Sequence, residues 1–485
     1  MAILPQVKHV VVVMLENRSF DDICGWLYQP GTTPQPSQFL PPSSPKEYDG
    51  LKSTYFNPVN AQYFKGQSAE TDQAASPTDP DETFQVADHA ASPTDPNPDP
   101  EETFSNVTYQ LFGPEKPSAN PTWPNMGFVI NYANATGHKS PVDIMKPFNP
   151  AQLPVISSLA ANFAVSDRYF CSIPSQTWPN RSFMHAGTSN GNVNNGDIPN
   201  PFDWDVRNIF NVLEDVGADW RIYSDTELVP PLTRVMFPNL WVYDDHFLHF
   251  DDFKQDCASG KLAQYTFLEP SFVVDPNDEH PPHDVVAGEK FLHDIWQAVS
   301  QSPAWPETLL MITYDEHGGT YDHVHPPFGA ASPDAKSNPG QEGFTFDRFG
   351  VRVPCILISP WIQAGTVFRS PTATPYDHTS LLATLRDWLS IPKDKMLTSA
   401  RIAAAPTFEQ VLNLQQARTD IPNIPPPAAE AKHTDTFKEP NSIQKSLVSA
   451  HAVQLGKDPA AIMKGIQNRE DAIHFFKANP WTTPH

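Results

Sequence analysis

The chain has 485 residues, which is long enough for one large catalytic domain with added segments. Its 32 basic and 56 acidic residues give a formal net charge of −24, and no basic cluster could follow a phosphate backbone, so nucleic acid is excluded as a partner. No apolar run reaches membrane-spanning length, and residues 1–20 show neither a basic leader nor a cleavage site. No signal peptide is therefore visible, which leaves two alternatives: the protein is not exported by that route, or its leader has been removed.

The first expected element is a strand over Lys8–Leu15, because a continuous Val-rich run is typical of a central parallel strand. Glu16 and Asn17 follow its last apolar residue, and a short helix is expected over Phe20–Leu27. Ligands of open α/β sheets bind beyond the carboxyl ends of the strands. This strand end is therefore the first candidate for a functional site.

Residues 30–121 are rich in Pro, Ser, Thr, Asp and Gln and show little periodicity, which predicts an insertion or lid within the domain. The string AASPTDP occurs twice in this segment, at Ala74–Pro80 and at Ala90–Pro96. Two copies are too few for a solenoid. The sequence leaves the role of the insertion open.

Thr177 marks a second candidate site, at the start of an expected helix. We expect an amphipathic helix over Gln152–Val165 and a strand over Ser166–Ser172, after which Thr177 lies just before a helix-compatible run at Arg181–Ala186. A hydroxyl there would lie near a helix N-terminus, which favours an anion such as phosphate. As a bare pattern, however, a Thr beside a Pro is more typical of a helix cap than of a nucleophile.

A second polar strand end follows Leu309–Tyr314, where Asp315 and Glu316 precede a glycine loop. Strands alternate with helices along the chain, which predicts an α/β three-layer sandwich with a doubly wound, mostly parallel sheet. We expect residues 1–415 to form the catalytic domain and residues 416–485 to form a helical tail packed on it. Further strands are expected at 220–223, 265–268 and 353–359, and further helices at 291–299 and 380–389.

Oxygen ligands from two strand ends favour a metal-dependent hydrolase. Carboxylate and amide oxygens suit calcium, magnesium or manganese, while nearby histidines leave zinc and iron open. The alternative interpretation is that Asp315 and Glu316 are only a charged strand terminus, with His317, His323 and His325 as ordinary loop histidines. Three polar clusters at strand ends favour a metal site over this alternative.

Four blocks of the sequence carry a family resemblance, and together they span most of residues 1–415. They are HVVVVMLENRSFDD, DRYFCSIPSQTWPNRSFMHAGTS, TYDEHGGTYDHVHPP, and VPCILISPWI with DHTSLLATL. On these motifs the chain resembles the bacterial phosphoesterase family, which joins phospholipase C enzymes to acid phosphatases and has an alkaline-phosphatase-like fold. The Thr-x-Pro-Asn-Arg form of the second block resembles the phospholipase C branch, whereas the acid phosphatases tend to have Ser at the first position.

The resemblance implies specific roles for the residues of these motifs. Glu16, Asn17, Asp315 and Glu316 would bind one divalent metal ion, with calcium favoured and zinc, iron and manganese left open. Thr177 would be the nucleophile and would form a phosphothreonine that water hydrolyses. A divalent cation beside the Thr177 oxygen would make its proton easier to remove.

Other residues of the blocks are expected around the phosphate. His280 and His378 are the candidates for protonating the leaving group. Trp178 is assigned to the headgroup, because aromatic faces attract a quaternary ammonium. The family also tends to bring a His from the region before its MxGF-like segment, but DPNPDPEETF has none there, and only His89 lies near. The expected phosphate-binding or supporting residues are Asn180, Arg181, His317, Asp322 and His323.

The resemblance implies a phospholipase C that hydrolyses phosphatidylcholine, or a related phospholipid, to diacylglycerol and phosphocholine. An acid phosphatase or broad phosphomonoesterase is the alternative among enzymes, and a calcium-stabilised binding protein is the alternative outside them. The expected partners are a phospholipid or phosphocholine ester and, transiently, a membrane surface. Family resemblance implies a secreted or periplasmic protein, and the sequence leaves the oligomeric state open.

Overall fold

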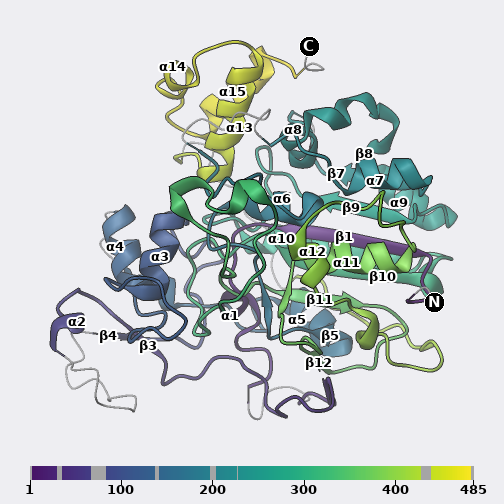
Figure 1. Cartoon of the computed structure of the whole chain (residues 1–485), viewed down its shortest axis with the longest axis horizontal. Helices are drawn as coiled ribbons and strands as arrows, with labels where there is room; N and C mark the ends of the chain where they lie inside the picture. The colour runs from purple at the N-terminus through teal and green to yellow at the C-terminus, as the bar shows by residue number, and fades with distance from the viewer. Residues whose placement is uncertain are drawn as a thin grey trace.

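A computed structural model describes residues 3–29, 35–66, 83–136, 141–196, 204–226, 228–427 and 438–481 (Figure 1). The first AASPTDP copy lies outside these residues, and the second lies within them. No helix among the described residues is long and apolar enough to cross a membrane.

A nine-stranded mixed sheet forms the centre of the molecule, in the order β2-β12-β5-β11-β10-β1-β9-β7-β8. Eight strands run in one direction, because only β11 is antiparallel to its neighbours β10 and β5. The predicted doubly wound, mostly parallel sheet is therefore confirmed. The strands of this sheet are β1 (His9–Leu15), β2 (Gln38–Leu40), β5 (Ala164–Val165), β7 (Trp220–Ser224), β8 (Phe247–His249), β9 (Tyr265–Glu269), β10 (Thr308–Tyr314), β11 (Cys355–Ile358) and β12 (Thr366–Phe368).

The middle of the sheet is fully buried because its strands are almost entirely apolar. Val11, Val12 and Val13 of β1 have no exposed surface, and the β10 residues are buried along the whole strand. A parallel strand covered on both faces needs such a continuous apolar run rather than an alternating one. The two strands pair in parallel from His9 with Thr308 to Leu15 with Tyr314.

Helices pack around the sheet in groups that contact one another. Contacts join α10 to α5 and α9, and α11 to α6 and α12. The helices are α1 (Phe20–Cys24), α2 (Tyr63–Gly66), α3 (Phe104–Phe112), α4 (Phe128–Thr136), α5 (Pro154–Asn162), α6 (Thr177–Ala186), α7 (Ile209–Val216), α8 (Leu232–Met236), α9 (Phe250–Ser259), α10 (Val285–Ser300), α11 (Thr379–Trp388), α12 (Ala400–Ala404), α13 (Ser442–Gln454), α14 (Pro459–Met463) and α15 (Arg469–Ala478).

The region between residues 152 and 172 differs from its prediction. The helix expected over Gln152–Val165 is α5, which starts at Pro154 and ends at Asn162, and the next residues form β5. Ala164 and Val165 pair with both β11 and β12, so tertiary strand pairing prevails over helical periodicity. The strand expected over Ser166–Ser172 is only β6 (Tyr169–Phe170), which pairs with β13 (Tyr376–Asp377) outside the main sheet.

Part of the predicted 30–121 insertion belongs to the main sheet, because β2 pairs with β12 at its edge. The rest contributes α3 and a small sheet of β3 (Phe56–Pro58) and β4 (Thr83–Gln85). These elements and α4 share a second apolar core that includes Val107, Leu111 and Phe128. Figure 1 shows this region beside the central sheet, and the C-terminal helices α13–α15 at another edge of the molecule. The proposed division at residue 415 stays a prediction.

Candidate active site

The two polar strand ends meet, because β1 and β10 are neighbours with matched ends. Leu15 pairs with Tyr314, so Glu16 and Asn17 emerge beside Asp315 and Glu316. The Asn17 backbone N–H donates to Asp315 Oδ1 over 3.0 Å. All four side chains are fully buried. The structure thus brings the four predicted metal ligands together.

Thr177 is the first residue of α6, and its hydroxyl lies among these residues. Its Oγ1 donates to Glu16 Oε2 over 3.2 Å and lies 3.4 Å from Asn17 Oδ1. The preceding turn is fixed by Asn180, whose side-chain amide donates to the carbonyls of Ile173, Ser175 and Gln176 and whose Oδ1 accepts from the Ile173 N–H. Asn180 therefore holds the position of Thr177.

Arg181 lies one helical turn after Thr177 and is fully buried. Its guanidinium donates to Glu16 Oε1 through Nε over 2.8 Å and also through Nη2. Its Nη1 is 3.6 Å from Glu269, and its Nε is 4.0 Å from Asp315. This two-point contact orients the Glu16 carboxylate, so Arg181 positions a proposed ligand and does not contact Thr177 through a hydrogen bond.

The acidic cluster around Thr177 fits a divalent cation. Asp315 Oδ2 and Glu316 Oε1 are buried and have no hydrogen-bond partner among the described residues. Burial and then the neighbouring Asp315 raise the pKa of Glu316 well above its usual value. Burial also raises the pKa of Glu16, although Arg181 works against the shift. Unpaired buried carboxylate oxygens of this kind are the donors that a hard cation prefers.

His378 and His280 are engaged through both ring nitrogens. His378 Nε2 donates to the Asp315 carbonyl over 2.6 Å, and its Nδ1 accepts from the Tyr169 hydroxyl. His280 Nδ1 donates to the Pro281 carbonyl, and its Nε2 accepts from Ser442. Burial lowers the pKa of both rings. Neither ring hydrogen-bonds to Thr177, and the general-acid role stays a prediction.

His317 lies beside the proposed ligands. Its Nδ1 is 3.3 Å from Glu316 Oε2, and its Nε2 hydrogen-bonds to Gln110 of α3 over 2.8 Å. Burial lowers the pKa of His317 to about 3, so the ring is neutral. His317 therefore lies between the Glu316 carboxylate and α3, and its Nδ1 is a buried atom with no hydrogen-bond partner among the described residues.

Asp322 and His323 belong to a separate charged cluster. Arg352 is paired to Asp322 over 3.0 Å and to Asp21 over 2.8 Å, and His323 donates to Asp21 and to Asp49. Asp21, Asp322 and His323 have ligand atoms within 4.8 Å of one another, as a metal triad would. Arg352 supplies positive charge to both carboxylates, and the cluster joins the loops after β1 and β10.

Trp178 and His89 are not at the site surface. Trp178 is fully buried, and its ring packs against Trp204 at 5.8 Å between centroids. The Trp178 ring thus packs in the core, and its assignment to the headgroup stays a prediction. The His89 side chain is 58% exposed and pairs with Asp88.

Two residues that sequence reasoning missed border Thr177. Gln176 donates to Glu102 Oε1 over 3.1 Å, and its own Oε1 accepts from the Asn195 N–H. Glu102 is only 1% exposed, and burial followed by the neighbouring Glu101 raises its pKa to about 8. The only sequence feature that could have pointed to Glu102 was the acidic pair Glu101 and Glu102 just before α3, and such a pair is typical of an ordinary exposed segment.

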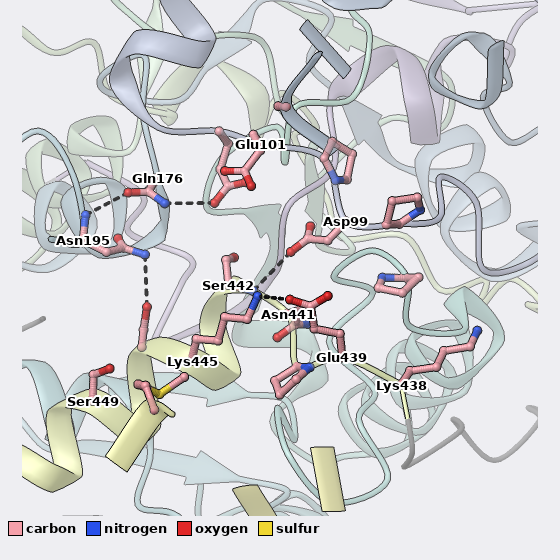
Figure 2. Close-up of a pocket in the computed structure, with 18 of the residues that line it drawn as sticks. Asp99, Glu101, Gln176, Asn195, Lys438, Glu439, Asn441, Ser442, Lys445 and Ser449 are labelled. Carbon is pink, nitrogen blue, oxygen red and sulfur yellow. Dashed lines mark hydrogen bonds and ion pairs between the residues drawn. The ribbon is translucent and has the colours of Figure 1, made fainter. Parts of the chain in front are cut away.

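Glu102 and Gln176 line a cavity of about 680 Å³. Figure 2 shows Asp99, Glu101, Gln176 and Asn195 on one side of it and residues of the α13 region on the other. Gln176 directly precedes Thr177 in the chain, and Glu102 interacts electrostatically with Asp315 and Glu316, so the cavity lies on the Glu102 side of the proposed ligand cluster.

A hydroxyl presented by a helix N-terminus to clustered carboxylates at strand ends defines the class of the protein as a hydrolase of phosphoesters. The profile of the Phosphoesterase family matches residues 7–392. The chain belongs to this family.

Named relatives agree with the family. Non-specific phospholipase C6 of Arabidopsis thaliana is 35% identical over 444 residues, which cover 88% of this chain and 76% of that protein. Non-specific phospholipase C3 of the same plant is 34% identical, and the match covers 93% of this chain and 83% of that protein. Phospholipase C B of Mycobacterium tuberculosis is 26% identical, and the match covers 87% of this chain and 83% of that protein. A solved alkaline phosphatase superfamily protein from Vibrio parahaemolyticus covers 53% of this chain and 65% of that chain, at 11% identity and a TM-score of 0.32.

Proposed function

We propose that this protein is a phospholipase C that hydrolyses glycerophospholipids, phosphatidylcholine included, to diacylglycerol and a phosphorylated headgroup. The observation behind the proposal is the position of Thr177 Oγ1, which lies between Glu16 and Asn17 at the first residue of α6. The names of the relatives support a phosphoric diester as the substrate.

The reaction would use Thr177 as the nucleophile in two displacements. Glu16 accepts the hydrogen bond of the hydroxyl and so directs the oxygen lone pairs towards a bound phosphorus. The positive end of the α6 dipole favours the phosphoryl group at the same place. Thr177 Oγ1 forms the bond to phosphorus, the bond to the diacylglycerol oxygen breaks, and that oxygen takes up a proton. Water then attacks the phosphothreonine and restores the Thr177 hydroxyl.

Glu16, Asn17, Asp315 and Glu316 would hold one divalent cation, because their oxygens include buried ones without partners. Such a cation would lower the pKa of the Thr177 hydroxyl and neutralise charge on the phosphoryl oxygens. We propose calcium, since the donors are oxygens, with manganese, zinc and iron as the alternatives.

Thr177→Ala tests the proposal, with Thr372→Ala in an exposed loop as the control. We expect Thr177→Ala to fold normally and to lose phospholipid turnover, while the control keeps it. Acid quenching of the wild-type enzyme during turnover should give a phosphorylated peptide that contains Thr177. Wild-type activity of Thr177→Ala would overturn the nucleophile assignment.

Two other functions make different predictions. A phosphomonoesterase would prefer p-nitrophenyl phosphate to p-nitrophenyl phosphorylcholine, whereas a phospholipase C would prefer the diester. A calcium-stabilised binding protein would bind the metal and hydrolyse neither compound. We also propose secretion, which fractionation of the source cells would test.

A further inference from the structure

The cavity lined by Gln176 and Glu102 is built from parts of the chain that lie far apart in sequence. One wall consists of residues 97–102, and the other comes from the segment that leads into α13. Asp99 Oδ2 accepts from the backbone N–H of Ser442 over 3.1 Å and joins the two walls, as Figure 2 shows. Asn195 lies 3.5 Å from Ser446 of α13 across the same space.

In the proposed reaction, this position suits the headgroup. Diacylglycerol leaves in the first displacement, whereas the headgroup stays attached to phosphorus throughout and leaves with the phosphate when water cleaves the bond between phosphorus and Thr177 Oγ1. The headgroup therefore needs a polar space near Thr177, and the acyl chains need a path to the lipid surface. The cavity lined by Gln176 and Glu102 offers such a space. A volume of about 680 Å³ admits any common headgroup, so chemistry and not size must discriminate among them.

The lining of the cavity does not suit a quaternary ammonium. A choline group is usually held by aromatic faces. None of the described residues that line this cavity is aromatic. Trp178, the nearest aromatic residue in sequence to Thr177, is buried against Trp204 instead.

The lining does offer hydrogen-bond acceptors. Its charged members are Asp99, Glu101, Glu102, Glu439, Lys438 and Lys445. Lys445 is paired to Glu439 over 2.9 Å. Asp99 Oδ1 is a buried atom without a hydrogen-bond partner, and the nearest ring nitrogen, His280 Nδ1, is 3.7 Å away and donates to Pro281. A primary ammonium has three N–H donors and would satisfy such acceptors, whereas a trimethylammonium has none.

We infer that this cavity is the headgroup subsite, that it prefers a primary-amine headgroup to a choline headgroup, and that Asp99 is the specificity-determining acceptor. The inference rests on the proposed phospholipase C function and names the substrate class that the site selects. Glu102 forms the end of the subsite next to Gln176 and Thr177.

Steady-state hydrolysis of dioleoyl phosphatidylethanolamine and dioleoyl phosphatidylcholine in matched detergent micelles tests the preference. We expect kcat/KM to be about tenfold higher for the ethanolamine lipid, since a charge-assisted hydrogen bond has about this effect. In Asp99→Asn the ratio should fall close to one, and Asp99→Glu should recover part of it. The control Asp88→Asn removes an exposed carboxylate that pairs with His89, and should keep the wild-type ratio.

Equal or faster hydrolysis of the choline lipid by the wild type would overturn the inference, and an unchanged ratio in Asp99→Asn would overturn the role of Asp99. If the protein hydrolyses no phospholipid, the proposed function fails, and calorimetric binding to the wild-type protein still tests the cavity. Phosphoethanolamine should then bind more tightly than phosphocholine. Equal affinity of the two compounds would refute the subsite.

Discussion

Asn17 and Gly318 approach each other so closely that a side chain at residue 318 would collide with the Asn17 backbone. A Cβ atom at Gly318 would lie 2.1 Å from the Asn17 carbonyl oxygen and 2.6 Å from the Asn17 Cβ. Both residues have left-handed backbones, with φ of +56° at Asn17 and +59° at Gly318. Gly318, two residues after Glu316, thus allows the two strand ends to share one site.

Gly318→Ala should therefore displace Asn17 and strongly reduce kcat. We expect it to destabilise the fold by about 3 kcal/mol, of which only about 1 kcal/mol comes from the left-handed backbone. Gly217→Ala is the matched control, because Gly217 has φ of +69° with no atom within 4 Å of the added Cβ. Urea unfolding and turnover of the two variants measure the difference. Similar losses in both would show that the close approach is unimportant.

Arg181→Met should be among the most destabilising single substitutions in the protein. It would leave the buried carboxylates of Glu16 and Glu269 without their shared cation, at a cost of about 3–5 kcal/mol. Arg207→Met is the comparison, because the pair of Arg207 with Asp215 is about half exposed and should contribute less than about 1 kcal/mol. Equilibrium unfolding by urea would give both values. A loss below 1 kcal/mol in Arg181→Met would contradict the orienting role of its guanidinium.

Binding of a divalent cation should release protons and raise the melting temperature. Without a cation, burial raises the pKa of Glu316 well above its usual value, so this carboxyl group takes up protons more readily than a free one. A cation displaces those protons as it binds. Calorimetric titration with calcium in two buffers of different ionisation enthalpy would count the released protons. Glu316→Gln should release fewer of them, and an identical proton count would rule out Glu316 as a ligand.

The cluster around His323 should make stability depend on pH between about 6.5 and 9. Burial opposes the charged ring, yet Asp21 and Asp49 raise the pKa of His323 from 6.5 to about 9. The stabilisation is complete below the unfolded pKa and is lost as the pH rises through the folded pKa. It amounts to at most about 3 kcal/mol.

His323→Gln should remove this contribution. Arg352, Asp21, Asp322 and Asp49 surround the ring and stay in both proteins. The difference in unfolding free energy between wild type and variant should therefore be large at pH 6 and small above pH 9, by chemical denaturation in steps of pH. A difference that does not change with pH would show that the ring is not charged.

Sequence reasoning found the four proposed ligands because β1 and β10 are unbroken apolar runs that end abruptly in oxygen-bearing side chains. The same reasoning could not find Glu102, because an acidic pair in a Pro-rich stretch has no local signature of burial. Its burial depends on α13, about 340 residues away in the sequence. Trp178 illustrates a related limit, since a tryptophan in the core and one in a ligand cage look alike in sequence. The two-residue strand β5 was missed because its pairing partners lie in β11 and β12.

The pairing of β1 with β10 also limits how the gene can change. The register from His9 with Thr308 to Leu15 with Tyr314 aligns both polar ends at once. Insertion or deletion of one codon within either strand would turn its side chains to the opposite face and move the strand end by about 3.3 Å. Length variation among descendants of this protein should therefore be confined to the loops, while these two seven-residue strands keep their length.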